Sequence, residues 1–228
     1  MKKYLQIIGG THRGQKIAFD HNDALRPTSG KLKEILFNWI QFEIEDAHCL
    51  DLFSGSGSLA FEALSRGAAS LTVIEKNKKC YLNIINNNKL FKFEDRFQSY
   101  FLDAFVWIKR NELTSFDFIF IDPPFDKDYV TKILKILAEH KNLKSSCKIY
   151  IEMSKRESFE LPNNFSILKE KKLGEVKAYL IENEKPSYKE PPKEVCFYAY
   201  KRINHFREIL AQFQAKETTQ IPDIVLSN

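Results

Sequence analysis

The chain has 228 residues, of which 43% are hydrophobic and 29% are charged, and its formal net charge is +5. This length and composition predict a soluble protein with one main domain and appendages, able to bury a substantial core. No apolar stretch is long enough to span a bilayer, and the N-terminus has no apolar signal core, so neither a membrane span nor a signal peptide is expected. The mildly positive charge is compatible with a nucleic-acid partner without requiring one.

Cysteine and histidine give no pattern typical of a metal or redox site. The four cysteines, Cys49, Cys80, Cys147 and Cys196, are far apart and form no Cys-x-x-Cys pair, and the five histidines are scattered. We therefore expect no metal, no redox motif, and a reduced cytoplasmic protein.

Residues 1–42 predict a β-hairpin followed by a helix. Apolar, β-branched stretches cover Tyr4–Ile8 and Gln15–Phe19, and the basic tip between them holds Thr11–Gly14. The charge of this hairpin fits a solvated surface at least as well as an RNA contact. The turn Leu25–Thr28 then precedes a helix that has Lys33 on its predicted polar side.

From about residue 46 the chain alternates between strands and helices, which predicts a mostly parallel, doubly wound sheet ending in antiparallel strands. The expected strands cover 49–53, 71–74, 97–102, 116–121 and 148–151, with helices over 59–66, 78–90, around Trp107 and over 129–140, and a hairpin over 165–169 and 176–181. The spacing of Leu82, Ile85 and Leu90 predicts the apolar face of the helix over 78–90.

Three parts follow from this pattern. Residues 1–42 form the hairpin and first helix, and residues 43–184 form the α/β domain. Residues 185–228 read as a proline- and charge-rich linker followed by an amphipathic helix over about 195–216.

Acidic and glycine residues follow successive predicted strands. The loop Asp51–Gly57 follows the first strand, Glu75 ends the second, and Asp103 comes after the third. The carboxyl ends of parallel strands form the ligand-binding edge of an open α/β sheet. Glycines let a ligand approach the backbone, and an acidic residue after the second strand can bind two ribose hydroxyls.

The same loop distinguishes between cofactors. Gly55 and Gly57 lack the third glycine of a dinucleotide-binding loop, and Asp51 disfavours a pyrophosphate but suits the amino group of an amino acid. Turn glycines and solvated acids are the alternative interpretation. The set favours S-adenosylmethionine over NAD, with candidate contacts at Asp51, Phe53, Gly55, Gly57, Glu75, Asp103 and Ala104.

The motif Asp122-Pro123-Pro124-Phe125 follows the apolar strand over 116–121. Two successive prolines stop the strand and stiffen the turn. The Asp122 carboxylate and a backbone carbonyl can accept the two N–H bonds of an exocyclic amine, while Phe125 stacks on a flat base. A plain strand-ending turn, with an Asp cap for the helix near Asp128, is the alternative.

Taken together, these motifs resemble the RsmD-type family of bacterial small-subunit ribosomal RNA guanine-N2 methyltransferases. The match covers about residues 6–182 and departs from the family pattern at Lys33, where Arg is expected, and beyond residue 185, where the family has no counterpart. It rests on Ile7–Gly10 with Arg13-Gly14, Leu25–Thr28, Glu34 with Leu36–Trp39, Asp51–Gly57, Glu62–Ala68 and Asp122–Phe125.

The resemblance implies a Rossmann-like class I methyltransferase fold, S-adenosylmethionine as donor, and a guanine in small-subunit rRNA as target. Asp122, Pro123, Pro124 and Phe125 would then form the catalytic turn. Candidate substrate contacts are His12, Arg13, Arg26, Thr28, Lys33 and Glu152, and the rRNA substrate is expected within a small-subunit particle.

Two other functions are also compatible with the sequence. A DNA adenine or protein glutamine methyltransferase would use similar turn chemistry, although such enzymes commonly carry Asn at the position of Asp122. A non-catalytic rRNA-binding assembly factor would keep the fold without turnover, which the complete donor pocket argues against. The sequence leaves the modified guanine and the oligomeric state open.

Overall fold

The structure is a computed structural model that describes residues 2–20, 30–125 and 128–184. The chain divides into two units, residues 1–185 and 186–228, and the second lies outside the described residues. The linker and helix expected over 185–228 therefore stay predictions, as does the turn around Arg26 and Thr28.

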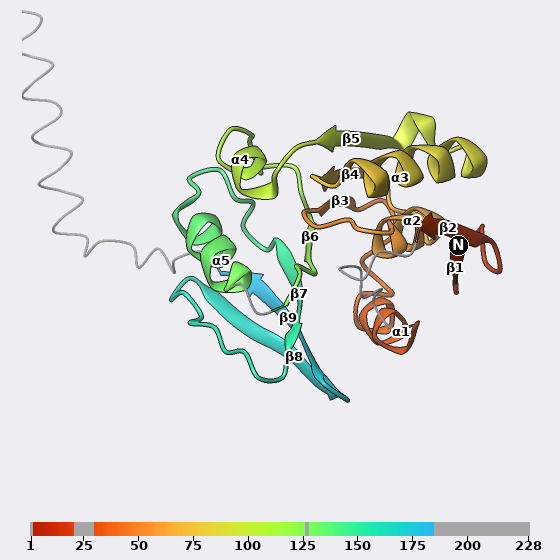
Figure 1. Ribbon diagram of the computed structural model, residues 1–228. Helices are drawn as coiled ribbons and strands as arrows, with labels where there is room; N and C mark the ends of the chain where they lie inside the picture. The colour runs from red at the N-terminus through yellow and green to blue at the C-terminus, as the bar shows by residue number, and fades with distance from the viewer. Residues whose placement is uncertain (1, 21–29, 126–127, 185–228) are drawn as a thin grey trace, which may run out of the picture. The chain divides into compact units, whose positions relative to one another are not determined.

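Seven strands form the central sheet: β3 (His48–Asp51), β4 (Ser70–Glu75), β5 (Phe97–Phe101), β6 (Phe118–Ile121), β7 (Lys148–Ser154), β8 (Phe165–Leu173) and β9 (Val176–Asn183). Their order is β5-β4-β3-β6-β7-β9-β8 (Figure 1). Strands β3 to β7 pair in parallel, and β9 runs antiparallel to both β7 and β8. This confirms the predicted doubly wound, Rossmann-like sheet with an antiparallel end.

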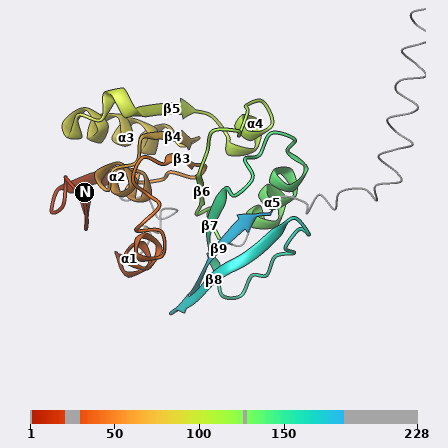
Figure 2. The same ribbon diagram turned by 180° about the vertical axis from the view of Figure 1, so that it is seen from behind.

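Five α-helices are described: α1 (Gly30–Trp39), α2 (Ser58–Ser65), α3 (Lys78–Phe91), α4 (Ala104–Ile108) and α5 (Tyr129–Glu139). They cover the two faces of the sheet, because α1, α2 and α3 contribute to one buried cluster and α4 and α5 to another. Figures 1 and 2 show α1 and α5 on opposite sides of β6 and β7. No helix in the described part of the chain is long and apolar enough to cross a membrane.

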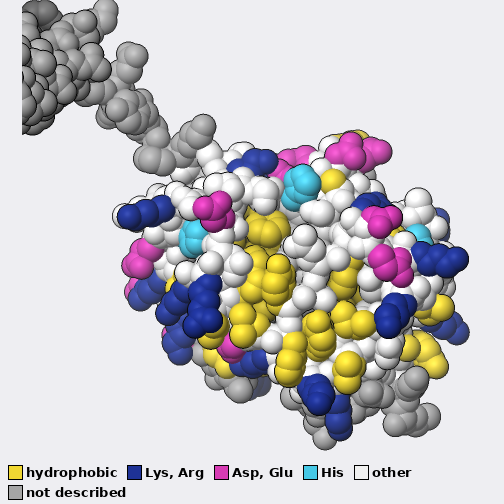
Figure 3. Space-filling model, turned by 90° about the horizontal axis from the view of Figure 1, so that it is seen from above, with side chains coloured by type: hydrophobic (Ala, Val, Ile, Leu, Met, Phe, Trp, Pro, Cys, Tyr) yellow, Lys and Arg dark blue, Asp and Glu magenta, His cyan; other side chains and the backbone are white. Residues whose placement is uncertain are grey.

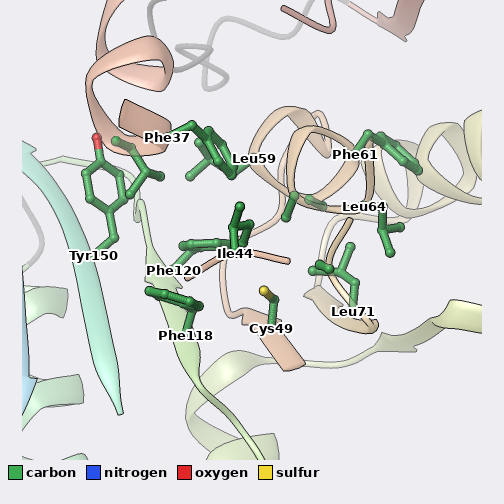
Figure 4. Close-up of a cluster of buried hydrophobic side chains, with 14 of the residues drawn as sticks. Phe37, Ile44, Cys49, Leu59, Phe61, Leu64, Leu71, Phe118, Phe120 and Tyr150 are labelled. Atoms are coloured by element: carbon green, nitrogen blue, oxygen red, sulfur yellow. The ribbon is translucent and has the colours of Figure 1, made fainter. Parts of the chain in front are cut away.

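Aromatic side chains fill much of the space between α1 and the sheet. Phe37 of α1 meets Phe120 of β6 with ring centroids 6.3 Å apart. Figure 4 shows Tyr150 of β7 beside this pair, and all three side chains are buried. These contacts fix α1 against β6, the strand that ends at the Asp122 turn, and against its neighbour β7.

The apolar face predicted for α3 is wrong. Leu82 and Leu90 are 49% and 68% exposed, whereas Ile84 and Phe91 are buried. The helix buries polar Asn87 on the same face, because its side chain accepts from the Ala18 N–H at 3.0 Å and donates to the Ala18 carbonyl at 2.8 Å. A polar residue with a specific partner therefore occupies a position that the apolar pattern assigns to solvent.

The N-terminal hairpin consists of β1 (Lys2–Gln6) and β2 (Lys16–Asp20). Its loop is bound to α2: the Thr11 N–H donates to the Ser65 carbonyl at 2.7 Å, and the Ser65 hydroxyl donates to the Gly9 carbonyl at 2.6 Å. Gly10 lies so close to α2 that a Cβ at its position would stand 1.8 Å from the Ser65 oxygen. The hairpin is thus attached to the helix that follows the Asp51–Gly57 loop.

Lys33 is buried, contrary to its predicted place on the polar side of α1. Its side chain is 2% exposed, and its ammonium lies 3.3 Å from the carboxylate of Glu62, which is fully buried. The ammonium also donates to the Gln6 carbonyl at 2.7 Å and to the Ser58 hydroxyl at 3.1 Å. The prediction that Lys33 contacts the substrate is therefore wrong, because its ammonium is buried and bound to groups within the protein.

Glu62 links α2 to α1 through this ion pair and to the N-terminal hairpin loop through a backbone hydrogen bond. One carboxylate oxygen accepts from the Ile8 N–H at 2.9 Å, and the other lies 2.8 Å from Nε of Arg66. Burial lowers the pKa of Lys33, while the Glu62 charge acts in the opposite direction. Removing one partner of a buried ion pair strongly lowers the free energy of unfolding, because the other charge stays buried without compensation.

Figure 3 views the molecule from above, the side on which Figure 1 shows α4 and β5. Hydrophobic side chains gather in the middle of this face, with charged side chains at its flanks. Edge strand β5 contributes exposed aromatic residues, since Tyr100 and Phe101 are 39% and 52% exposed.

Candidate active site

A cavity of about 820 Å³ lies at the carboxyl ends of the parallel strands. Its size is in the range of cavities that hold a small organic ligand. Its walls come from the loop after β3, the residues that end β4 and β6, the start of α4, and the turn between β8 and β9. Sequence-predicted residues in the lining are Asp51, Phe53, Gly55, Glu75, Ala104, Asp122, Pro123, Pro124, Phe125 and Glu152.

The loop between β3 and α2 is held by its own backbone and by Glu75. The Gly55 N–H donates to the Glu75 carboxylate at 2.8 Å, and the Gly57 N–H donates to the Ser54 carbonyl at 2.6 Å. Gly57 has φ +78°, and a Cβ there would stand 2.7 Å from the Phe61 ring. Gly57 therefore shapes the loop without lining the cavity, which corrects its predicted place as a direct cofactor contact.

Asp51 ends β3 and is buried, with its carboxylate accepting from the Phe53 N–H at 3.3 Å. Burial and, to a smaller extent, the nearby Asp122 charge together raise the pKa of Asp51 to about 8, against the opposing effect of the Phe53 hydrogen bond. Two carboxyl groups thus face one cavity, so a cationic ligand there would relieve their repulsion.

Glu75 ends β4 and is positioned by backbone N–H groups. Besides Gly55, it accepts from the Asn77 N–H at 2.6 Å. Burial raises its pKa, and these hydrogen bonds partly offset the rise. Its carboxylate is fixed at the position where nucleotide-binding βαβ units bind ribose hydroxyls.

Asp103 does not line the cavity, although the adjacent Ala104 does. Its carboxylate caps α4 by accepting from the Phe105 N–H at 2.9 Å, and it lies 3.1 Å from the Lys76 ammonium. The Asp103 hydrogen bond raises the pKa of Lys76. Both oxygens of the Asp103 carboxylate thus have a partner within the protein, and its predicted contact with the donor stays a prediction.

The turn Asp122–Phe125 follows β6, as predicted, and all four residues line the cavity. Pro123 is buried, Pro124 is exposed, and the half-buried Phe125 packs against the core beneath α1. Within the neighbouring strand β7, Glu152 is buried and accepts from the Tyr150 hydroxyl at 2.7 Å. The Asp122–Phe125 turn and the Asp51 loop therefore share one cavity.

The predicted RNA contacts on the hairpin lie away from the cavity lining. The His12 imidazole lies 3.1 Å from the Phe91 carbonyl and packs on Phe93 at 4.4 Å between ring centroids, so it holds the hairpin. Arg13 is exposed and stays a prediction. Arg26 and Thr28 lie outside the described residues.

Sequence reasoning missed the wall formed by the β8–β9 turn, Leu173–Val176, and by Leu32 of α1. The hairpin around Gly174 was expected, and the pairing of β8 with β9 confirms it. Its position at the cavity depends on β9 pairing with β7, which local patterns do not reveal.

Comparisons with known proteins match most of this chain, residues 5–182, to one family. The family described as Conserved hypothetical protein 95 matches residues 5–182. Ribosomal RNA small subunit methyltransferase D of Buchnera aphidicola is 36% identical, covering 77% of this chain and 92% of its own length. The protein of that name from Escherichia coli K12 is 35% identical, with 79% and 90% covered.

Solved structures agree on the fold. The Escherichia coli protein yhhF superposes with a TM-score of 0.72 at 34% identity, covering 80% of this chain and 99% of its own. An RNA methyltransferase from Salinibacter ruber, solved with S-adenosyl-L-homocysteine, has a TM-score of 0.57 at 14% identity, which bears on the fold alone.

The C-terminal part has a separate resemblance that sequence reasoning missed. Residues 193–228 match the family described as Poxvirus Late Transcription Factor VLTF3 like. Among the related proteins, R429 of Acanthamoeba polyphaga mimivirus matches only a short stretch of the chain: it is 54% identical over 55 residues, which are 24% of this chain and 13% of R429.

The cavity at the carboxyl edge, the sheet order and these matches all indicate a methyltransferase over about residues 5–182. The chain belongs to the family described as Conserved hypothetical protein 95, that of the ribosomal RNA small subunit methyltransferase D proteins, and it is a methyltransferase of this family.

Proposed function

We propose that the protein transfers a methyl group from S-adenosylmethionine to the exocyclic N2 amine of a guanine in small-subunit ribosomal RNA. The observation that carries this proposal is that the Asp122–Phe125 turn and the Asp51 loop line one cavity. The names of the related proteins support rRNA as the substrate. A small-subunit particle is the form of substrate that we favour.

The donor would lie along the carboxyl edge of β3 and β4. Glu75 would accept hydrogen bonds from the two ribose hydroxyls, and the Asp51 carboxylate would pair with the donor's ammonium group. Phe53 and Ala104 supply apolar wall next to this edge. The donor supplies an electrophilic methyl group on a sulfonium, whose positive charge suits a cavity lined by Asp51 and Asp122.

The chemical step needs a better nucleophile than free guanine. The N2 lone pair is delocalised into the ring, so the amine becomes nucleophilic only when its geometry changes. In this proposal Asp122 and the Pro123 carbonyl accept its two N–H bonds, while Phe125 stacks on the base and keeps N2 in line with the methyl carbon. Positioning of this kind contributes on the order of 7–11 kcal/mol at best.

The bond changes are balanced without a further reactant. N2 forms a bond to the methyl carbon as the carbon–sulfur bond breaks, and sulfur keeps that electron pair as a neutral thioether. The methylated nitrogen then loses one proton to Asp122 or to water. Asp122 also offsets the positive charge that develops on nitrogen in the transition state.

Donor binding is expected to depend on pH through Asp51. The raised pKa of about 8 means that the carboxyl group of the empty site is protonated at neutral pH. A bound ammonium favours the carboxylate, so binding releases a proton and affinity rises with pH up to about 8, by at most about tenfold per pH unit. Calorimetry in two buffers of different ionisation enthalpy measures this proton release.

Asp51→Asn separates this effect from titration of the donor itself. The variant should bind more weakly and lose the proton release between about pH 6 and 8. Equal proton release by the wild type and by Asp51→Asn would contradict the assigned role.

Product analysis tests the proposed function directly. Purified small-subunit particles or RNA from cells lacking the gene are incubated with enzyme and labelled donor, digested to nucleosides and compared with N2-methylguanosine by mass spectrometry. Label in DNA adenine or protein glutamine would instead support the competing methyltransferase activity. RNA binding without any labelled product would support an assembly factor.

A further inference from the structure

Strand β8 contains Lys169, Lys171 and Lys172 and ends at the cavity. The β8–β9 turn, Leu173–Val176, forms part of the cavity wall together with Leu32 of α1. Lys155, which follows β7, holds this turn: its N–H donates to the Glu175 carbonyl at 2.8 Å, and its ammonium pairs with the Glu175 carboxylate. The end of β8 is therefore fixed at the site by the strand that carries Glu152.

The register of β8 shows which face its side chains occupy. Lys169 is paired with Leu180, and Lys171 with Ala178. Directly paired residues project to the same face of a sheet. Leu180 and Ala178 belong to the buried cluster on the α1 face, so Lys169 and Lys171 project to that face, in line with Leu173 of the cavity wall.

Lys172 projects to the opposite face of the same strand. Its neighbour Glu170 is paired with Tyr179, which belongs to the cluster on the α5 face. The Lys172 ammonium lies 3.3 Å from the Glu170 carboxylate. By contrast, neither Lys169 nor Lys171 has an ion-pair partner among the described residues, and both are exposed.

These two lysines lie at a spacing that suits a chain of phosphates. At a rise of about 3.3 Å per residue, the Cα atoms of Lys171 and Lys169 lie roughly 7 and 13 Å from that of Leu173. A guanine that reaches the Asp122 turn must be unstacked from its neighbours, whose phosphates then lie over the rim of the cavity. β8 is an edge strand, so nothing in the sheet covers its outer side.

We propose that Lys169 and Lys171 bind phosphates of the RNA that flanks the target guanine, so that the α1 face of β8 forms part of the RNA interface. This inference rests on the proposed function and extends it to the position of the substrate backbone. Lysines on an edge strand also deter pairing with other strands. That second role depends on charge at the edge, so it would apply to Lys172 as much as to Lys171.

Lys171→Glu and Lys172→Glu form a matched pair for the test. The two variants change the net charge equally, at adjacent exposed positions of one strand, and differ in the face that they alter. We expect Lys171→Glu to weaken binding to small-subunit RNA by about tenfold near 0.1 M salt and to lower the slope of log affinity against log salt by about one. Lys172→Glu should stay within about twofold of the wild type.

RNA affinity is measured with S-adenosylhomocysteine present, so no turnover is needed, and donor affinity and thermal unfolding are followed for each variant. Equal losses in the two variants, or no loss in either, would overturn the inference. Wild-type enzyme that binds the RNA but forms no N2-methylguanosine would refute the proposed function alone. Wild-type enzyme that shows no salt-dependent RNA binding would refute both.

Discussion

Asp122→Asn is expected to lower kcat for RNA methylation by on the order of 10²–10³-fold, the cost of removing one charge-stabilising group from a preorganised site. The amide keeps the shape of the side chain and one acceptor oxygen but loses the negative charge that opposes the cation developing on nitrogen. Single-turnover kinetics with saturating donor and RNA measure this step separately from binding and product release.

A second readout identifies the site of action. The charge of Asp122 contributes to the raised pKa of Asp51. Removing that charge should lower the pKa of Asp51 and move the pH dependence of donor binding to lower pH. A variant that lost activity through misfolding would not show this shift.

Asp128→Asn provides the matched control for this prediction. Asp128 is exposed, has φ +51°, and makes no side-chain hydrogen bond to the start of α5. Asn is tolerated in that left-handed conformation, so activity should remain within about twofold of the wild type. An Asp122→Asn variant as active as Asp128→Asn would end the proposed role of the turn.

Glu62→Ala is expected to lower the free energy of unfolding by about 3–5 kcal/mol, which is a large share of the stability of a typical domain. The substitution leaves the buried Lys33 ammonium without its carboxylate and removes the acceptor of the Ile8 N–H. It also frees Arg66, whose guanidinium stacks over the Phe37 ring at 5.0 Å. Denaturant unfolding followed by circular dichroism measures the change.

Two further variants show whether burial is the cause. Glu160→Ala removes a carboxylate that is 86% exposed and 4.0 Å from the Lys135 ammonium, so its effect should not exceed about 1 kcal/mol. Lys33→Met should cost less than Glu62→Ala, because Glu62 keeps Arg66 and the Ile8 N–H as partners. Similar losses in Glu62→Ala and Glu160→Ala would show that the buried ion pair is not important for stability.

The sequence by itself determined the sheet and the edge at which ligands bind. Alternating apolar strands and helices impose parallel pairing with crossovers of one hand, so the residues after β3, β4 and β6 must meet at one edge. Asp51, Glu75 and the Asp122 turn could be assigned to the site for this reason, because each directly follows a strand.

Tertiary packing decided the roles of charged and polar residues far from the strand ends. Lys33 has the spacing of a solvent-exposed residue, but its ammonium is buried because Glu62, almost thirty residues later, meets it between α1 and α2. The burial of Asn87 likewise depends on β2, which lies against α3. The partner in each case is distant in sequence, so no local period can predict the contact.

The same limit applies to the β8 lysines. The sequence shows a run of charges at Lys169–Lys172 but does not say which of them face the site. Only the register with β9, and the pairing of β9 with β7, assigns Lys169 and Lys171 to the α1 face and Lys172 to the other. Side chains alternate along a strand, so a shift of one residue would exchange the two faces, and long-range pairing fixes that register.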